Sequence, residues 1–302
     1  MSIVVVGSVA LDSVKTPFGE VQEVLGGSAT YFSVSASFFT DVKLVAVVGE
    51  DFPESHINLL ESRSINLSGL QKKPGKTFRW KGKYGYDLNE AITLDTKLNV
   101  FESFTPVIPS SYRDTKYVFL ANIDPELQSK VLKFVENPKL VALDTMNFWI
   151  EGKINELKET LKHVDILTIN EGEARELSKE ANLVKAAKTI LSFGPKTLIV
   201  KRGEYGSLMF SDTGIFAAPA YPLESVFDPT GAGDSFAGGF MGYLSNTGNL
   251  ADGNIRQAII FGSVMASFNV EEFSLNRMKT LTYNEIEQRY KSFKNLTHFE
   301  DL

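Results

Sequence analysis

Residues 227–240 are Phe-Asp-Pro-Thr-Gly-Ala-Gly-Asp-Ser-Phe-Ala-Gly-Gly-Phe, a glycine-rich stretch in which a loop turns into a helix. Pro229 disfavours helix at the preceding residue, while Gly231 and Gly233 allow a tight turn that exposes backbone N–H groups. From Asp234 onward the apolar residues recur at helical spacing, so we expect a helix to begin within or just after the glycines. Free amides and small side chains at a helix N-terminus suit phosphate. The stretch therefore predicts an anion site where a helix begins.

Asp234 would lie next to an anion bound at this site. A carboxylate is ionised at neutral pH, and beside a transferring phosphoryl group it can accept the proton of an attacking hydroxyl. We therefore predict Asp234 as a catalytic base. The loop expected to hold the developing charge consists of Gly231, Ala232 and Gly233. The alternative is that Asp234 only caps the helix and that the glycines only form a turn.

Short apolar runs rich in β-branched residues recur along the rest of the chain. Their continuous apolar character is typical of strands buried on both faces of a parallel sheet. These runs are residues 2–7, 43–48, 117–120, 139–143, 166–169 and 197–200. Helical patterns lie between several of them, at residues 27–39, 125–134, 171–179 and 183–193. The alternation predicts an α/β fold with a doubly wound, mostly parallel sheet flanked by helices, in one domain of residues 1–302.

Two segments, at about residues 12–25 and 76–100, break this rhythm. In the second, aromatic residues alternate mostly with polar residues or glycine, a period of two that indicates antiparallel strands with one apolar face. These aromatic residues are Phe78, Trp80, Tyr84 and Tyr86. A small sheet inserted into a large α/β domain commonly serves as a lid over a site. The alternative is an ordinary pair of surface hairpins.

Composition narrows the class of protein. A chain of 302 residues with 43% hydrophobic and 23% charged residues has the make-up of an ordinary soluble globular protein. Its formal net charge of −6 lacks the basic footprint of a nucleic-acid binder. Cysteine is absent, which excludes disulfides, thiolate metal sites and cysteine catalysis, and the three histidines are far apart. The apolar runs are too short to cross a bilayer and no signal segment opens the chain, so we expect a cytoplasmic protein without membrane contact.

Further motifs accompany the glycine loop. They are Gly7-Ser-Val-Ala-Leu-Asp12, Gly26-Gly-Ser-Ala-Thr-Tyr-Phe-Ser-Val-Ser-Ala36, Gly49-Glu-Asp51, Asn170-Glu-Gly-Glu173 and Lys201-Arg-Gly-Glu-Tyr-Gly206. Together with Asp-Pro-Thr-Gly-Ala-Gly-Asp at residues 228–234, they resemble, in order, the signatures of the ribokinase family, the PfkB-type carbohydrate and nucleoside kinases. The resemblance extends over most of the chain. It implies an ATP-dependent kinase that transfers the γ-phosphate to a hydroxyl of a small sugar or sugar-like substrate.

The resemblance also implies which residues hold the nucleotide and its metal. The nucleotide-binding residues are Asn170, Lys201, Gly203, Gly206, Thr230, Gly231 and Gly233. Mg²⁺ prefers oxygen ligands and keeps several waters, so we expect Glu173 to hold Mg²⁺ through a bridging water. Without this context, Asn170 and Glu173 form a plain helix-capping pattern. Near Asp228 the family often has a monovalent-cation site, for example for K⁺, although backbone capping would use the same residue.

On the acceptor side, the resemblance assigns substrate binding to Asp12 and to the paired glycines Gly26 and Gly27, which let the backbone approach a sugar closely. Tyr31 departs from the pattern, because many family members have an asparagine there that binds substrate hydroxyls. An aromatic ring favours a flat or less polar surface, which puts ribose and fructose-phosphate specificity in doubt. Tyr31 could equally belong to the core.

Three further residues are candidate contacts to the acceptor. Trp80 could stack on the apolar face of a sugar or on a nucleobase, or it could form the packing face of the lid. Asn122 and Asn147 each follow a predicted strand, where their amides could bind substrate hydroxyls. Each asparagine could equally be a turn residue.

Two alternative functions stay open beside the sugar kinase. One is a nucleoside kinase, and the other is a non-catalytic ligand-binding protein with the same fold, which the intact Asp234, Asn170 and Glu173 argue against. A nicotinamide-binding dehydrogenase is disfavoured, since Gly7 opens no Gly-x-Gly-x-x-Gly string. The expected partner is a small sugar or nucleoside, and the chain could be a monomer or a homodimer paired through exposed lid edges.

Overall fold

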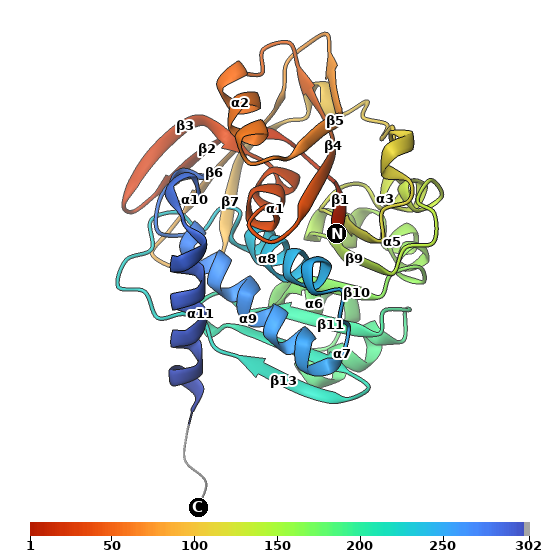
Figure 1. The fold of residues 1–302 in the computed structure, drawn as a ribbon, viewed down its shortest axis with the longest axis vertical. Coiled ribbons are helices and arrows are strands. Elements are labelled where there is room, and N and C mark those ends of the chain that lie inside the picture. Colours follow the sequence, from red (N-terminus) through yellow and green to blue (C-terminus); the bar gives the residue numbers. More distant parts are fainter. Residues whose placement is uncertain (299–302) are drawn as a thin grey trace, which may run out of the picture.

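A nine-stranded sheet in the order β13-β12-β11-β10-β9-β8-β1-β4-β5 forms the centre of the molecule (Figure 1). The computed structural model describes residues 1–298. The strands are β1 Ser2–Val6, β4 Asp41–Gly49, β5 Asn66–Lys73, β8 Tyr117–Leu120, β9 Leu140–Asp144, β10 Ile166–Asn170, β11 Thr197–Lys201, β12 Ser207–Ser211 and β13 Gly214–Ala218. Neighbours from β5 to β11 are parallel, and β12 and β13 continue the sheet antiparallel. The predicted doubly wound, mostly parallel sheet is confirmed.

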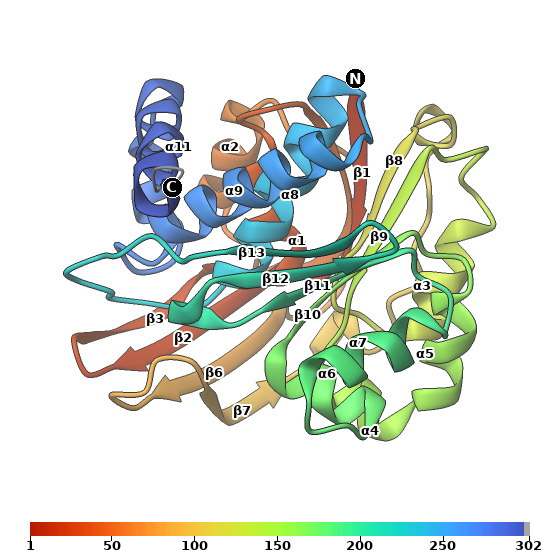
Figure 2. The same ribbon diagram turned by 90° about the horizontal axis from the view of Figure 1, so that it is seen from below.

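Helices cover both faces of this sheet (Figure 2). One face carries α1 Ser28–Ala36, α2 Glu54–Ser62, α8 Ala232–Thr247, α9 Asp252–Asn269, α10 Asn276–Thr280 and α11 Tyr283–Thr297. The other carries α3 Pro125–Leu132, α4 Asn147–Gly152, α5 Ile154–Leu161, α6 Glu171–Ser178 and α7 Leu183–Leu191. Strand β1 shows why both faces are apolar: Ile3 and Val5 pack into one core cluster, and Val4 and Val6 into the other.

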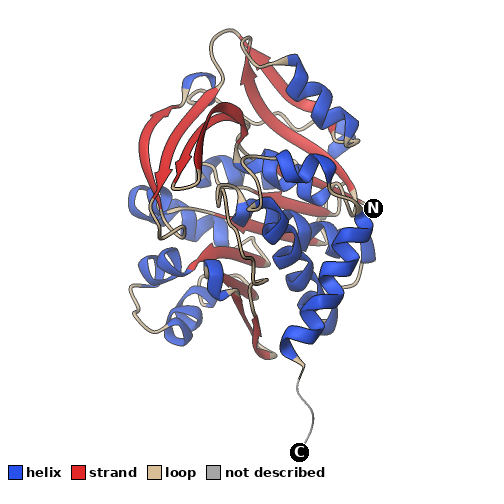
Figure 3. Ribbon diagram, turned by 90° about the vertical axis from the view of Figure 1, so that its left-hand side faces the viewer, coloured by secondary structure: helices blue, strands red, loops and turns tan. Residues whose placement is uncertain are grey.

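A separate four-stranded sheet in the order β3-β2-β6-β7 forms the lid (Figure 3). Its strands are β2 Ala10–Thr16, β3 Gly19–Gly26, β6 Phe78–Tyr84 and β7 Ala91–Lys97. Strands β2 and β6 are parallel, whereas β2–β3 and β6–β7 are antiparallel. In β7 the alternating Ile92 and Leu94 leave one face of the strand, but they are 54% and 48% exposed. As the edge strand of the lid, β7 is exposed along its whole length.

The carboxyl ends of the parallel strands bring distant segments to one edge of the central sheet. In the register, Asp144 of β9 lies opposite Thr168 of β10, and Asn170 of β10 lies opposite Lys201 of β11. Ligands bind outside this edge in open α/β folds. Among residues 1–298, no helix has the length and apolar character needed to cross a bilayer.

Candidate active site

Helix α8 begins at Ala232, directly after the glycine turn, as predicted. Gly231 is its N-cap, with a left-handed φ of 76°. A β-carbon on Gly231 would lie 2.3 Å from Cγ of Tyr31, so the turn rests on the face of that ring. Glycine is therefore required here for both its backbone conformation and its lack of a side chain.

The backbone amides of this turn are not all free to bind an anion. The Ala232 amide donates to the Pro229 carbonyl at 3.1 Å and so closes the turn, and its role in holding developing charge stays a prediction. Within the part of the chain that the structure describes, the amides of Gly233 and Asp234 have no hydrogen-bond acceptor. These two amides therefore form the anion-binding end of α8.

Asp234 lies in the first turn of α8, beside other charged groups. Burial and then the charge of Asp144 raise the pKa of its carboxyl, Lys201 opposes both, and the resulting pKa is about 7. A carboxyl with a pKa near 7 is matched to proton transfer at neutral pH. The surroundings of Asp234 thus suit a general base better than a simple helix cap.

Lys201 supplies the positive charge of this cluster. Its Nζ atom lies 2.6 Å from Oδ2 of Asp144, and the two side chains are 16% and 6% exposed. A β-carbon on Gly233 would lie 3.1 Å from the same Nζ atom, so the ammonium lies against the amide end of α8. Lys201 was predicted to bind nucleotide, and its position beside the anion site fits that role.

Asn170 and Glu173 form a reciprocal capping box at the start of α6. Asn170 Oδ1 accepts the Glu173 amide and Glu173 Oε2 accepts the Asn170 amide, both at 2.8 Å. The plain capping arrangement is therefore present. Glu173 is also 7% exposed, and burial, followed by the charge of Asp144, raises the pKa of its carboxyl to about 8.

The charges of this cluster fit a divalent cation. The charges of Asp144, Glu173 and Asp234 all act on one ammonium, that of Lys201. Within residues 1–298, no three His, Cys, Asp or Glu side chains are grouped closely enough to hold a metal ion by themselves. Waters and phosphate oxygens would therefore complete the shell of Mg²⁺, which suits that ion's preference for retained water.

Asp12 of β2 lies over the paired glycines, as the resemblance implied. Its Oδ2 atom accepts the Gly27 amide at 3.4 Å and is 1.9 Å from the place that a β-carbon on Gly26 would take. Burial raises the pKa of Asp12 to about 7, and the charges of Asp228 and Asp234 add to this shift. The two aspartates, Asp12 and Asp234, therefore share one electrostatic environment at the site.

Tyr31 is 1% exposed and belongs to the main core cluster of the α1 side. Its ring packs against Gly231. Burial, followed by the charges of Asp12 and Asp228, raises the pKa of its hydroxyl. These observations match the core alternative rather than a direct contact with substrate.

Asp228 joins two loops behind the glycine turn. Its Oδ1 atom accepts the Thr230 amide at 2.9 Å and its Oδ2 atom accepts the Ser274 amide at 3.0 Å. Asn269 donates to the Thr230 carbonyl at 2.8 Å, which holds the same turn. Both oxygens of Asp228 are thus engaged as backbone caps, the second of the two roles expected for this residue.

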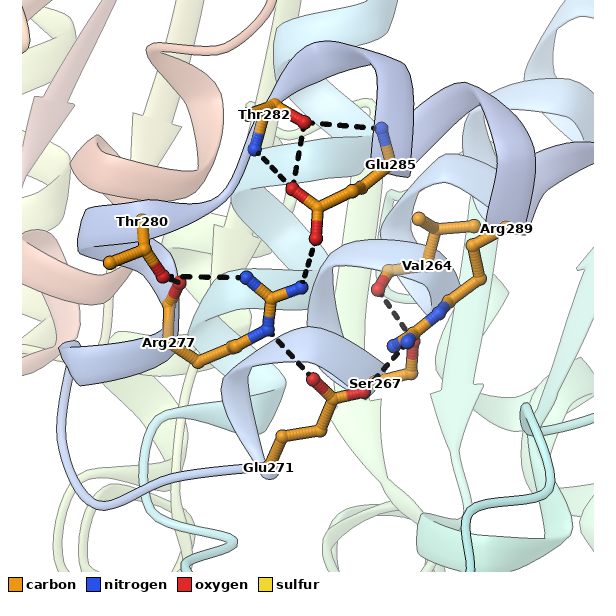
Figure 4. Close-up of polar contacts among 8 residues, drawn as sticks. All are labelled: Val264, Ser267, Glu271, Arg277, Thr280, Thr282, Glu285 and Arg289. Carbon is orange, nitrogen blue, oxygen red and sulfur yellow. Dashed lines mark hydrogen bonds and ion pairs between the residues drawn. The ribbon is translucent and has the colours of Figure 1, made fainter.

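An ion-pair network holds the loop after α9 in place (Figure 4). Glu271 binds Arg277 at 2.9 Å and Arg289 at 2.7 Å, which ties α9, α10 and α11 together. The Arg289 guanidinium also lies 3.5 Å from the ring centroid of Phe268. Since Ser274 is in this loop, the network supports the segment that caps Asp228.

Trp80 is a half-buried residue of the lid. Its indole Nε1 donates to Thr93 Oγ1 at 3.2 Å, and the ring covers Gly82 of its own strand. Because Trp80 is in register with Asp12 on the adjacent parallel strand, the two side chains leave the same face of the lid. The ring is thus part of the lid's packing and lies on its site-facing side.

The tip of the β6–β7 hairpin meets both predicted nucleotide loops. Tyr84 Oη lies 3.3 Å from Thr230 Oγ1, and Asn89 Oδ1 lies 1.8 Å from the place of a β-carbon on Gly203. Gly203 has a left-handed φ of 54°. Gly206, with φ of 82°, instead packs against the Ala218 carbonyl at the end of β13, so its glycine serves the strand turn.

Asn122 lies in the loop after β8 and Asn147 in the helix that follows β9, both at the predicted edge of the sheet. Asn122 Oδ1 accepts the indole Nε1 of Trp149 at 3.1 Å. Asn147 is exposed and is the first residue of α4.

Asp144 is the site residue that our sequence analysis did not identify. A signal was present, because it directly follows the apolar run 139–143 and so had to reach the same edge as Asn170 and Lys201. Its partner Lys201 is 57 residues away, which no local pattern reveals.

Comparison with known proteins gives the family of this chain. Residues 2–280 match the model of the pfkB family carbohydrate kinases. A cytidine kinase from Thermococcus kodakarensis is 33% identical over 248 residues, which are 80% of this chain and 87% of that protein. The protein therefore belongs to the PfkB family, whose members are phosphotransferases that act on hydroxyl groups.

Solved structures agree with this fold. The nucleoside kinase of Methanocaldococcus jannaschii superposes with a TM-score of 0.77 at 24% identity, over 96% of this chain and 98% of that one. Ribokinase from Thermotoga maritima superposes with a TM-score of 0.77 at 25% identity, over 96% and 99% of the two chains. The family and its fold are thus shown.

Proposed function

We propose that this kinase transfers the γ-phosphate of ATP to a sugar hydroxyl of a nucleoside, with Asp234 as the general base. The observation that carries the proposal is the placement of Asp12 and Asp234 in one electrostatic environment beside the amide end of α8. From the sequence we expect a free sugar as the acceptor, with a nucleoside as the alternative. The similarity to a cytidine kinase over most of both chains supports the reverse order.

In this mechanism Asp12 accepts hydrogen bonds from the acceptor's hydroxyl groups beside Gly26 and Gly27. Asp234 takes the proton of the attacking hydroxyl while its oxygen forms a bond to the γ-phosphorus. The bond from that phosphorus to the bridging oxygen breaks, and ADP leaves with the electron pair. The amides of Gly233 and Asp234 and the ammonium of Lys201 stabilise the negative charge that spreads over the phosphoryl oxygens.

Mg²⁺, held through water by Glu173, would neutralise phosphate charge in this site. The monovalent-cation role expected for Asp228 is part of the proposal, although its two oxygens already cap backbone amides. ATP turnover in K⁺ buffer compared with a tetramethylammonium buffer tests that role directly.

The test is ATP consumption across a panel of nucleosides, ribose, fructose, fructose 6-phosphate and inositol, with Asp234→Asn beside the wild type. We expect a nucleoside to be the best acceptor and Asp234→Asn to lower kcat by about a hundred- to ten-thousand-fold. Asp252→Asn is the matched control, since Asp252 is also in the first turn of a helix, α9, but lies away from the site. A free sugar as best acceptor would restore the sugar-kinase order. If the wild type consumed no ATP with any acceptor in the panel, the non-catalytic binding protein would be favoured.

A further inference from the structure

The Asp144–Lys201 ion pair joins strands β9 and β11 across the end of β10, which lies between them. Asp144 ends β9 and Lys201 ends β11, while β10 lies between them. The Nζ–Oδ2 distance is 2.6 Å, and both side chains are largely buried. Burying two charges is costly unless the geometry is good, so a pair held in this way fixes where its charges lie.

The position fixed by this pair is the amide end of α8. Lys201 Nζ lies 3.1 Å from the place of a β-carbon on Gly233, and the charges of Glu173 and Asp234 act on the ammonium. The next residue, Arg202, is held away by Glu171 at 2.7 Å. Lysine has four flexible side-chain torsions, so without Asp144 its ammonium would not be confined to this place.

We propose that Asp144 is a positioning residue of the transfer reaction, which acts by holding the Lys201 ammonium against Gly233 where the phosphoryl group passes. The inference rests on the proposed function for its role in turnover. It adds Asp144 to the site with a role different from that of Lys201. Lys201 touches the phosphate, whereas the carboxylate of Asp144 contacts Lys201 and the Thr145 amide.

A double-mutant cycle on kcat tests this role. We expect Lys201→Met to lower kcat by about a hundredfold or more, and Asp144→Asn by about tenfold or more, with the KM of the acceptor unchanged. The double variant should match Lys201→Met when kcat is measured on the high-pH plateau, where the charge of Asp144 no longer changes the ionisation of Asp234. It also removes both charges of the Asp144–Lys201 pair together, so neither partner is left buried without the other.

Asp165→Asn is the matched control. Asp165 pairs with Lys196 at 2.9 Å at the start of the neighbouring strands β10 and β11, on the opposite edge of the sheet. Its kcat should equal that of the wild type. An Asp144→Asn variant with wild-type kcat would overturn the proposal, and so would a kcat loss of the same factor in the Lys201→Met background.

A binding measurement separates this proposal from the proposed function. We expect calorimetry without Mg²⁺ to show that Asp144→Asn weakens ADP binding only when Lys201 is present, and leaves adenosine binding unchanged. Deleting a negative charge would by itself strengthen phosphate binding, so a gain in ADP affinity would contradict positioning. If the wild type binds ADP but phosphorylates no acceptor, the proposed function fails while this binding cycle still decides the role of Asp144.

Discussion

Gly231 rests on the ring of Tyr31, close enough that a β-carbon on Gly231 would approach Cγ, Cδ1 and Cδ2 to 2.3–2.4 Å. This contact joins helix α1, which follows the paired glycines of the acceptor side, to helix α8, which opens the anion site. The acceptor and phosphate halves of the site are therefore built against each other. A substitution of Gly231 or Tyr31 should therefore affect both the acceptor half and the phosphate half of the site.

Gly231→Ala should abolish turnover and destabilise the fold. The new methyl group would meet the Tyr31 ring, and alanine would adopt a left-handed φ of 76° at Gly231. Together these effects should lower the free energy of unfolding by about 3 kcal/mol, measured by urea denaturation. Gly253→Ala is the control, since nothing lies within 4 Å of its added β-carbon. Equal stability of the two variants would show that the close contact with Tyr31 is not maintained in solution.

Substitutions of Tyr31 should separate packing from substrate binding. Because the ring is 1% exposed, Tyr31→Ala should cost about 3–5 kcal/mol of stability. Tyr31→Phe keeps the ring, so the KM of the acceptor should stay within about threefold of the wild-type value. Steady-state kinetics with the best acceptor provide the measurement. A large rise in KM for Tyr31→Phe would place its hydroxyl in contact with substrate instead.

The reaction should depend on pH through Asp234. Burial raises the pKa of this carboxyl to about 7, so kcat/KM should rise as the pH increases through about 7 and the base becomes ionised. Lys201 lowers this pKa, and Lys201→Met should therefore move the midpoint of the pH profile upward. Lys196→Met, which removes a lysine from the far edge of the sheet, should leave the midpoint unchanged. If Lys201→Met left the midpoint unchanged, the charge of Lys201 would not act on the carboxyl of Asp234.

The same carboxyl should make the protein less stable as the pH rises. The pKa of Asp234 is raised in the folded state to about 7 from an ordinary 3.8, so between these values the folded state binds more protons than the unfolded state. Its contribution therefore becomes unfavourable as the pH rises from about 4 to 7. Asp234→Asn should raise the Tm at pH 8 and leave it nearly unchanged at pH 4, as followed by calorimetry. A Tm that falls at pH 8 would mean that Asp234 stabilises the fold as an ordinary cap.

Much of the fold and part of the site could be predicted from the sequence because their signals are local. The turn at Gly231 and the helix after it depend on consecutive residues, and the capping pair Asn170 and Glu173 are three residues apart. The apolar runs that define the parallel strands are likewise continuous in sequence.

What could not be predicted depends on contacts between distant segments. Asp144 gains its role only by meeting Lys201, and Tyr31 became core because the Gly231 turn packs on its ring. The Ala232 amide donates to the Pro229 carbonyl, a contact that depends on the detailed shape of the turn. The exposure of β7 follows from its place at the edge of the lid, which its alternating pattern does not specify.

³¹P NMR can show whether Asp234 is the base of a phosphoryl transfer to a nucleoside. The sample would contain the protein with ATP, Mg²⁺ and cytidine as the first acceptor. We predict that a phosphomonoester signal and ADP appear in equal amounts with the wild type and with Asp252→Asn, and that neither appears on the same timescale with Asp234→Asn. Phosphomonoester formation by Asp234→Asn at the wild-type rate would show that Asp234 is not the base.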